Sequence, residues 1–128
     1  MEIERLVDEE LTSAIIGAAI EVHKVLGPGL LESAYEQCLC YELSQRGFSV
    51  VRQVELLVRY KDVQLDVGYR VDIIVENRVV LELKVEKTIT DLDRAQLLTY
   101  LKLSGKKVGL LLNFHVPALR DGIVRMVL

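Results

Sequence analysis

The sequence is poor in the residues that build stapled, fibrous or disordered proteins. Its 128 residues include two cysteines, two prolines, eight glycines and no tryptophan. This composition excludes a disulfide scaffold, a collagen-like repeat and a disordered chain, because 51% of the residues are hydrophobic and available for a core. At this length we expect one domain over residues 1–128.

The chain also lacks a long apolar run. No stretch approaches the length of about 20 residues that a membrane-spanning helix needs. The first ten residues, MEIERLVDEE, are acidic where a signal peptide would be basic and then apolar. Cys38 and Cys40 lie two apart in an expected helix, so their side chains point to different sides and do not bridge easily. We therefore expect free thiols, no membrane partner and a cytoplasmic location.

Positive charge is scarce as well. Sixteen Lys and Arg residues against 19 Asp and Glu residues give a formal net charge of -3. That balance argues against broad, non-specific affinity for nucleic acid over the whole surface. It still allows a local basic groove, and a site built of carboxylates counts as acidic only until it binds a metal ion.

The chain contains a regular succession of segments in which apolar residues recur at the spacing of a helix or of a strand. In chain order we expect helices over 11–26 and 31–45, three or four strands over the segments 49–60, 63–67, 69–75 and 79–85, a helix over 91–103, and strands over 107–113 and 121–128. A short helix is the alternative for the last segment. Thr12 or Ser13 is expected to cap the first helix, and Thr90 with Asp93 the third. This order predicts an α/β fold with a mixed β-sheet flanked by helices.

Two acidic residues interrupt the apolar strands of the segment Tyr69–Lys84. Asp72 lies in one apolar run and Glu82 in the next, although carboxylates are rarely buried without a partner. If residues 76–78 form a three-residue loop, Asp72 faces Glu82, and Lys84 shares the face of Glu82. Two opposed carboxylates destabilise a sheet unless one is protonated or a cation lies between them.

A hard divalent cation is one solution to this opposition. Mg²⁺ usually takes one or two carboxylates together with waters and phosphate oxygens. Lys84 would then reach past the ion toward a water or a phosphate. These residues alone leave an alternative open, in which the strand face is solvated and Asp72 pairs with Arg70 or Lys84.

The same residues resemble the signature of the PD-(D/E)XK nuclease superfamily, with Asp72 as the aspartate and Glu82 and Lys84 as the (D/E)XK pair. The segment Gly29–Tyr35 reads G-x-x-E-x-x-Y and resembles the pattern that names the GxxExxY family of that superfamily. The motifs occur in the family's order, and the resemblance covers nearly the whole chain.

A third motif, Gln96 and Tyr100, resembles the Q-x-x-x-Y pattern of exonuclease-like branches of the superfamily. The chain departs from the family pattern at Asp93, where a histidine is common. Read from the residues alone, Gln96 and Tyr100 are also a polar and an aromatic neighbour on one helix face at the edge of the core. Glu32, in the first turn of its helix, is also explained by the helix dipole.

The resemblance implies a restriction-endonuclease-like core of the order α-α-β-β-β-α-β that binds Mg²⁺ or Mn²⁺. In it Lys84 would orient the attacking water, and Gln96 and Tyr100 would line the site. The implied site consists of the metal ligands Asp72, Glu82 and Glu32 and the catalytic residues Lys84, Glu32, Gln96 and Tyr100.

We therefore expect a metal-dependent nuclease or nuclease-like phosphodiesterase that acts on nucleic acid, on DNA in preference to RNA. The alternative is a non-catalytic nucleic-acid or protein interaction module on the same fold, which the acidic balance and the small basic set favour. The apolar end Val124–Leu128 also suggests a homodimer whose strands pair across subunits.

Overall fold

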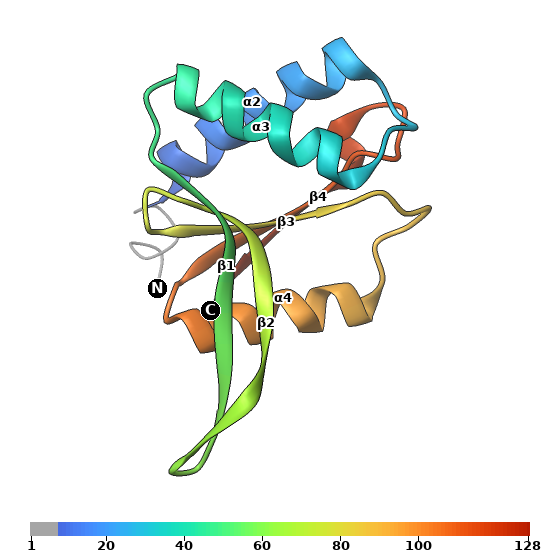
Figure 1. Cartoon of the computed structure of the whole chain (residues 1–128). Helices are drawn as coiled ribbons and strands as arrows, with labels where there is room; N and C mark the ends of the chain where they lie inside the picture. The colour runs from blue at the N-terminus through green and yellow to red at the C-terminus, as the bar shows by residue number, and fades with distance from the viewer. Residues whose placement is uncertain (1–7) are drawn as a thin grey trace.

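The structure, a computed structural model, describes residues 8–128 as helices packed on both faces of a five-stranded sheet (Figure 1). The elements are α2 (Glu9–Leu26), α3 (Glu32–Gln45), β1 (Val50–Tyr60), β2 (Val63–Val75), β3 (Val79–Lys84), α4 (Asp91–Ser104), β4 (Val108–Asn113), a 3₁₀ turn η1 (Leu119–Gly122) and β5 (Ile123–Val127). The predicted α/β class and mixed sheet are confirmed, and the architecture is consistent with a restriction-endonuclease-like fold.

The sheet has the strand order β1-β2-β3-β4-β5. β3 and β4 run parallel and are connected through α4, whereas the other neighbours are antiparallel. Every residue of β4 is buried, which is typical of a strand covered on both faces. In Figure 1, α2 and α3 cover one face and α4 covers the other.

Two hydrophobic cores result, one on each face of the sheet. Because strand side chains alternate, Leu81 and Leu83 of β3 face the core under α2 and α3, and Val80 faces the core under α4. Glu82 has the parity of Val80. The alternation of side chains along β3 therefore directs the carboxyl group of Glu82 toward α4, so the candidate site lies on the α4 side of the sheet.

The predicted cap of the first helix is wrong. α2 begins at Glu9, after Asp8, and Asp8 makes no side-chain cap. Neither Thr12 nor Ser13 precedes the helix; the Thr12 hydroxyl lies in its first turn and donates to the carbonyl of Glu9 at 3.0 Å. Apolar periodicity places the start too late, because the acidic residues that a helix N-terminus favours carry no apolar signal.

The segments 63–67 and 69–75 form one continuous strand, so three strands are present where three or four were expected, and the break at Gly68 is wrong. A Cβ atom on Gly68 would lie 2.6 Å from the carbonyl oxygen of Leu56. Glycine at this position lets the backbone of β1 approach closely, beside an irregularity in the β1–β2 register. The residue serves the pairing of β1 with β2 and does not end the strand.

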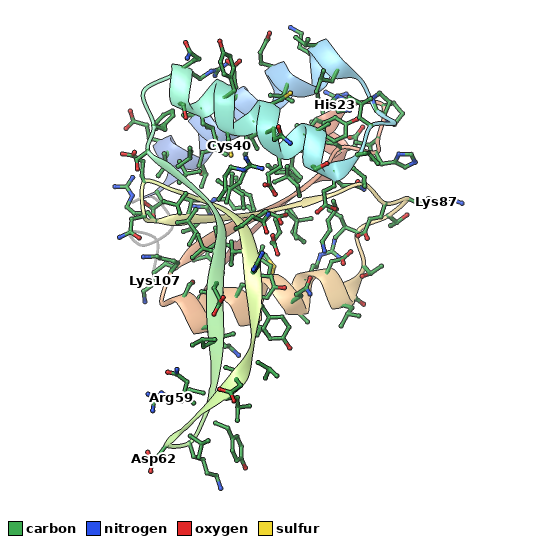
Figure 2. All side chains as sticks on the ribbon, in the orientation of Figure 1. His23, Cys40, Arg59, Asp62, Lys87 and Lys107 are labelled. Atoms are coloured by element: carbon green, nitrogen blue, oxygen red, sulfur yellow. The ribbon has the colours of Figure 1, made fainter. Side chains whose placement is uncertain are left out.

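The paired ends of β1 and β2 extend past the rest of the sheet, and we call residues 57–69 the arm. β3 pairs only with residues 73–75 of β2. Figure 1 shows the arm extending beyond α4, and Figure 2 places Asp62 at its tip. Every residue from 61 to 70 is exposed.

The remaining local predictions agree with the structure. The hydroxyl of Thr90 accepts from the N–H of Asp93 at 3.1 Å, and the N–H of Thr90 donates to the carboxylate of Asp93 at 2.9 Å, which confirms the capping box of α4. Cys38 and Cys40 are free, and the C-terminal segment forms a strand. Among residues 8–128, no helix combines the length and apolar character needed to cross a membrane.

Candidate active site

Asp72 and Glu82 face each other where β2 and β3 stop pairing. The ladder joins Ile73 to Leu81, so the predicted loop over residues 76–78 is confirmed and the next opposed positions are those of Asp72 and Glu82. Both strands follow the period-two pattern up to this point. The register therefore brings two acidic side chains to one place at the end of the paired region.

Each of the two carboxyl groups is anchored by a backbone N–H of the opposite strand. The N–H of Asp72 donates to Oε2 of Glu82 at 3.0 Å, and the N–H of Leu83 donates to Oδ2 of Asp72 at 2.8 Å. These crossed bonds satisfy the backbone where the regular ladder has ended. The backbone of the two strands thus orients both carboxyl groups.

Glu82 is a buried acid that keeps its proton. Only 5% of the surface of Glu82 is exposed. Burial raises the pKa of Glu82 to about 9; the charge of Asp72 and a hydrogen bond with its carboxyl group add to the rise, and the charge of Lys84 opposes it. The raised pKa of Glu82 thus favours protonation, one of the two remedies expected for opposed carboxylates.

Lys84, at the end of β3, directs its ammonium group to α4. Its Nζ atom donates to Oε1 of Gln96 at 3.3 Å and lies 3.8 Å from Oδ1 of Asp93. Within residues 8–128, Asp72 forms no ion pair with Arg70 or Lys84, so the pairing that the sequence left open does not occur. The lysine is oriented by a polar and an acidic residue one helical turn apart.

Tyr100 lies one turn beyond Gln96 on α4, with its ring buried. Its ring centroid is 5.6 Å from that of Tyr69. Burial raises the pKa of Tyr100 to about 12, and at alkaline pH the charge of ionised Glu82 adds to the rise. The phenol therefore stays protonated and can donate a hydrogen bond. The structure brings Gln96 and Tyr100 to the same side of the sheet as Glu82 and Lys84.

The sequence model of the PD-(D/E)XK nuclease superfamily matches residues 9–126. The chain belongs to the PD-(D/E)XK nuclease superfamily. Comparison with curated proteins and with solved structures gave no match. Nucleases of this superfamily generally use divalent metal ions, and membership suggests a nucleic-acid substrate.

The acid pair of this superfamily member suits a divalent cation. Glu82 is buried beside the charge of Asp72, and a cation between them would replace the proton that Glu82 now holds. Two carboxylates with added waters are a usual Mg²⁺ environment. Within residues 8–128, no three His, Cys, Asp or Glu side chains are grouped as a metal site, so the structure does not gather Glu32 with the pair as a third ligand.

Glu32, the first residue of α3, approaches the site from the other layer. Burial raises its pKa, the charge of Asp72 adds to the rise, and Lys84 opposes it. The carboxyl group is half-buried and lies within electrostatic range of the acid pair. The two helices that begin near the end of β3 thus carry acidic residues at or close to their first turns, Glu32 on α3 and Asp93 on α4.

Tyr35 of the G-x-x-E-x-x-Y motif holds the loop before α3. Its side chain is fully buried. Its hydroxyl donates to the carbonyl of Gly27 and accepts from the N–H of Leu30 at 3.2 Å. Gly29 in the same loop has a φ of 101°, which favours glycine. The motif thereby fixes where α3 begins and, with it, the position of Glu32.

We expect Tyr35→Phe to lower the free energy of unfolding by about 1 kcal/mol, because the carbonyl of Gly27 and the N–H of Leu30 lose their partner while the ring remains. Urea denaturation measures the change. Tyr41→Phe is the matched control, since Tyr41 is exposed on the same helix and should change stability by less than about 0.5 kcal/mol. Equal effects of the two substitutions would show that the hydroxyl does not hold the loop.

Sequence reasoning missed Asn113 and Glu86. Asn113 is buried at the end of β4, where its Oδ1 accepts from the N–H of Glu86 at 3.2 Å and its Nδ2 donates to the carbonyl of Glu86 at 2.7 Å. These bonds fix the chain as it leaves β3 two residues after Lys84. The available signal was a polar side chain closing an otherwise apolar run.

Asp93 also interacts with Glu86, which the capping motif did not indicate. A hydrogen bond with Asp93 raises the pKa of Glu86, and burial adds to the rise. Burial opposes ionisation of Asp93 itself, but hydrogen bonds from Glu86 and Thr90 outweigh it and lower the Asp93 pKa. Asp93 therefore caps α4 and also places a negative charge beside Lys84.

Proposed function

We propose that the chain is a metal-dependent nuclease or nuclease-like phosphodiesterase of the GxxExxY family, acting on DNA in preference to RNA. The opposition of Asp72 and Glu82, with Lys84 on the same face of β3, carries this proposal. Asp72 and Glu82 would hold Mg²⁺ or Mn²⁺, with Glu32 as a further acidic group within electrostatic range of the pair. The ion would supply positive charge to a phosphate and lower the pKa of a bound water.

In this proposal Lys84, Gln96 and Tyr100 place a positive charge and a hydrogen-bond donor where the phosphate would bind. The Lys84 ammonium group is a compact cation directed at the attacking water or the phosphate. Gln96 accepts a hydrogen bond from it at 3.3 Å and keeps it oriented before substrate binds. The protonated phenol of Tyr100 is a donor for a phosphate or sugar oxygen. Such preorganised groups stabilise developing charge because they need no rearrangement during the reaction.

The proposal also includes two statements about organisation. The 128 residues form one domain, which is supported by the two cores sharing a single sheet. Two copies form a homodimer through β5, the last strand in the sheet order, by pairing across a two-fold axis. This arrangement would leave the site on β2 and β3 open, because two strands separate it from that edge.

Cleavage of labelled oligonucleotides tests the proposed activity. With Mg²⁺ or Mn²⁺ we expect cleavage that EDTA abolishes, and in Asp72→Asn we expect a loss of at least roughly a hundredfold, since the variant lacks a charged ligand at the pair. Asp121→Asn makes the same substitution at an exposed residue of η1 and should retain full activity.

Two outcomes separate the proposal from its alternative. Metal-dependent cleavage of equal rate in wild type and Asp72→Asn would assign the activity to another site or a contaminant. Binding of nucleic acid by a wild-type protein that cleaves nothing with either metal would favour a non-catalytic interaction module.

A further inference from the structure

A pocket opens between the arm and α4, next to the candidate catalytic residues. Its volume is about 440 Å³, within the range of small-ligand pockets. Tyr69 lines it from the arm, and Leu92 and Tyr100 line it from α4. Lys84 lies in its wall beside Gln96 and Asp93, and the Asp93 carboxylate is 3.8 Å from the ammonium group. The pocket thus combines apolar and aromatic side chains with the ammonium group of the proposed site.

Two tyrosines give this pocket an aromatic wall. The rings of Tyr69 and Tyr100 are 5.6 Å apart and tilted by 48°. Tyr69 is 45% exposed, whereas Tyr100 is almost fully buried. The buried ring therefore supports the exposed one, which is free to stack on a flat ligand with little loss of conformational entropy.

The apolar face of the arm continues outward from the pocket. Val63, Leu65 and Val67 alternate with polar residues along β2, so they share one face with Tyr69. All four are exposed, and Tyr60, also exposed, lies opposite Val63. We call these five residues the apolar ribbon. It leads from the tip of the arm, where Figure 2 shows Asp62, to the pocket beside Lys84.

Charge on the arm does not favour a duplex. Arg59 and Lys61 are balanced by Asp62 and Asp66, so the arm has no net charge. Neutralisation of phosphates contributes to the affinity for duplexes and single strands alike, but a duplex keeps the faces of its bases stacked inside, where the arm cannot contact them. An uncharged ribbon of apolar and aromatic side chains instead matches the faces of unpaired bases, which stack on aromatic residues without regard to sequence.

We propose that the pocket and the apolar ribbon bind unpaired nucleotides, so that the substrate is single-stranded nucleic acid or the single-stranded end of a duplex. This inference rests on the proposed function and names its substrate class. One base stacks on Tyr69, the adjoining phosphate reaches the ammonium group of Lys84, and the following bases lie along Val67, Leu65 and Val63. A second copy of the chain covering the ribbon is the competing occupant.

Fluorescence anisotropy in EDTA measures this binding without cleavage. The probes are a labelled oligothymidine of about 12 nucleotides and a duplex of the same length. We expect the single strand to bind at least about tenfold more tightly than the duplex, and Tyr69→Ala to weaken its binding roughly ten- to a hundredfold. Leu92→Ser, at a residue that is 78% exposed and makes little contribution to folding, should weaken it several-fold.

Two substitutions at exposed residues of the other layer are the controls. Tyr41→Ala on α3 and Val25→Ser on α2 remove similar side chains far from the pocket. Both should bind the single strand as wild type does. Weakening by these controls to the same extent as by Tyr69→Ala would overturn the inference.

Two further results would also overturn it. One is equal affinity for the single strand and the duplex. The other is a dimer, seen by light scattering, that Leu65→Asp separates into monomers while oligothymidine affinity is unchanged, because a second copy would then cover the ribbon.

The inference and the proposed function can fail separately. Single-strand binding without cleavage at any metal concentration would support the inference and remove the nuclease. Metal-dependent cleavage confined to duplex would support the nuclease and overturn the inference of a single-stranded substrate.

Discussion

Lys84→Ala is expected to lower the turnover of metal-dependent cleavage roughly a hundred- to a thousandfold, the usual effect of removing one preorganised charge from a transition state. The ammonium group is held by Gln96 at 3.3 Å and is not bonded to Asp72. Its removal should therefore leave the acid pair and its Mn²⁺ binding intact. Single-turnover cleavage at saturating Mn²⁺, with metal binding measured separately, distinguishes the two effects.

Lys107→Ala is the control for this experiment. Lys107 is exposed before β4 and lies away from the site (Figure 2), so the same substitution there should leave turnover unchanged. Unchanged turnover in Lys84→Ala would remove the lysine from the reaction. A parallel loss of Mn²⁺ binding in Lys84→Ala would show that the lysine acts through the metal site.

Glu82→Gln is expected to make the metal-free protein more stable at alkaline pH. Folding raises the pKa of Glu82 from 4.5 to about 9, so the folded state binds this proton more tightly than the unfolded state. The stabilisation is complete below pH 4.5 and is lost as the pH rises toward 9. With up to about 1.4 kcal/mol lost per pH unit, a deficit of several kcal/mol is expected near the upper limit.

Urea denaturation in EDTA at about pH 5 and about pH 9 measures this difference. The wild type should lose stability between the two conditions much more than Glu82→Gln does, because the amide cannot ionise. Glu55→Gln, at an exposed residue of β1, should behave as the wild type. Identical pH dependence in wild type and Glu82→Gln would mean that burial of Glu82 does not raise its pKa in solution.

Mn²⁺ should restore part of the alkaline stability of the wild type, since a cation takes the place of the lost proton. The site thus lowers the stability of the metal-free fold, which is common where function requires buried charge.

The acid pair was predictable because it depends on local quantities. The strand period and the length of the loop over 76–78 determine that Asp72 opposes Glu82, and both are visible in the sequence. The capping box of α4 was predictable for the same reason. Gly68 was misjudged because its role depends on how closely the β1 backbone approaches it, and no local pattern contains that distance.

The surroundings of the pair depend on packing between distant segments. That Gln96 lines the same site as Lys84 was implied only by the family resemblance, because periodicity places Gln96 on a helix face but does not say which strand that face covers. Its hydrogen bond with Lys84 was not predicted. The contact of Asp93 with Lys84 and the clamp of Asn113 on Glu86 also join residues brought together by the sheet. The arm and its pocket appeared only when β2 proved continuous.

Calorimetric titration of Mn²⁺ into the wild type and Asp72→Asn at about pH 8 tests the metal site most directly, because metal binding there must displace the proton of Glu82. We expect a single Mn²⁺ site in the wild type, with a buffer-dependent heat that reports proton release, and no such site in Asp72→Asn. A wild type that binds no Mn²⁺, or a variant that binds it equally well with the same proton release, would contradict the assignment of Asp72 and Glu82 as the metal-binding pair.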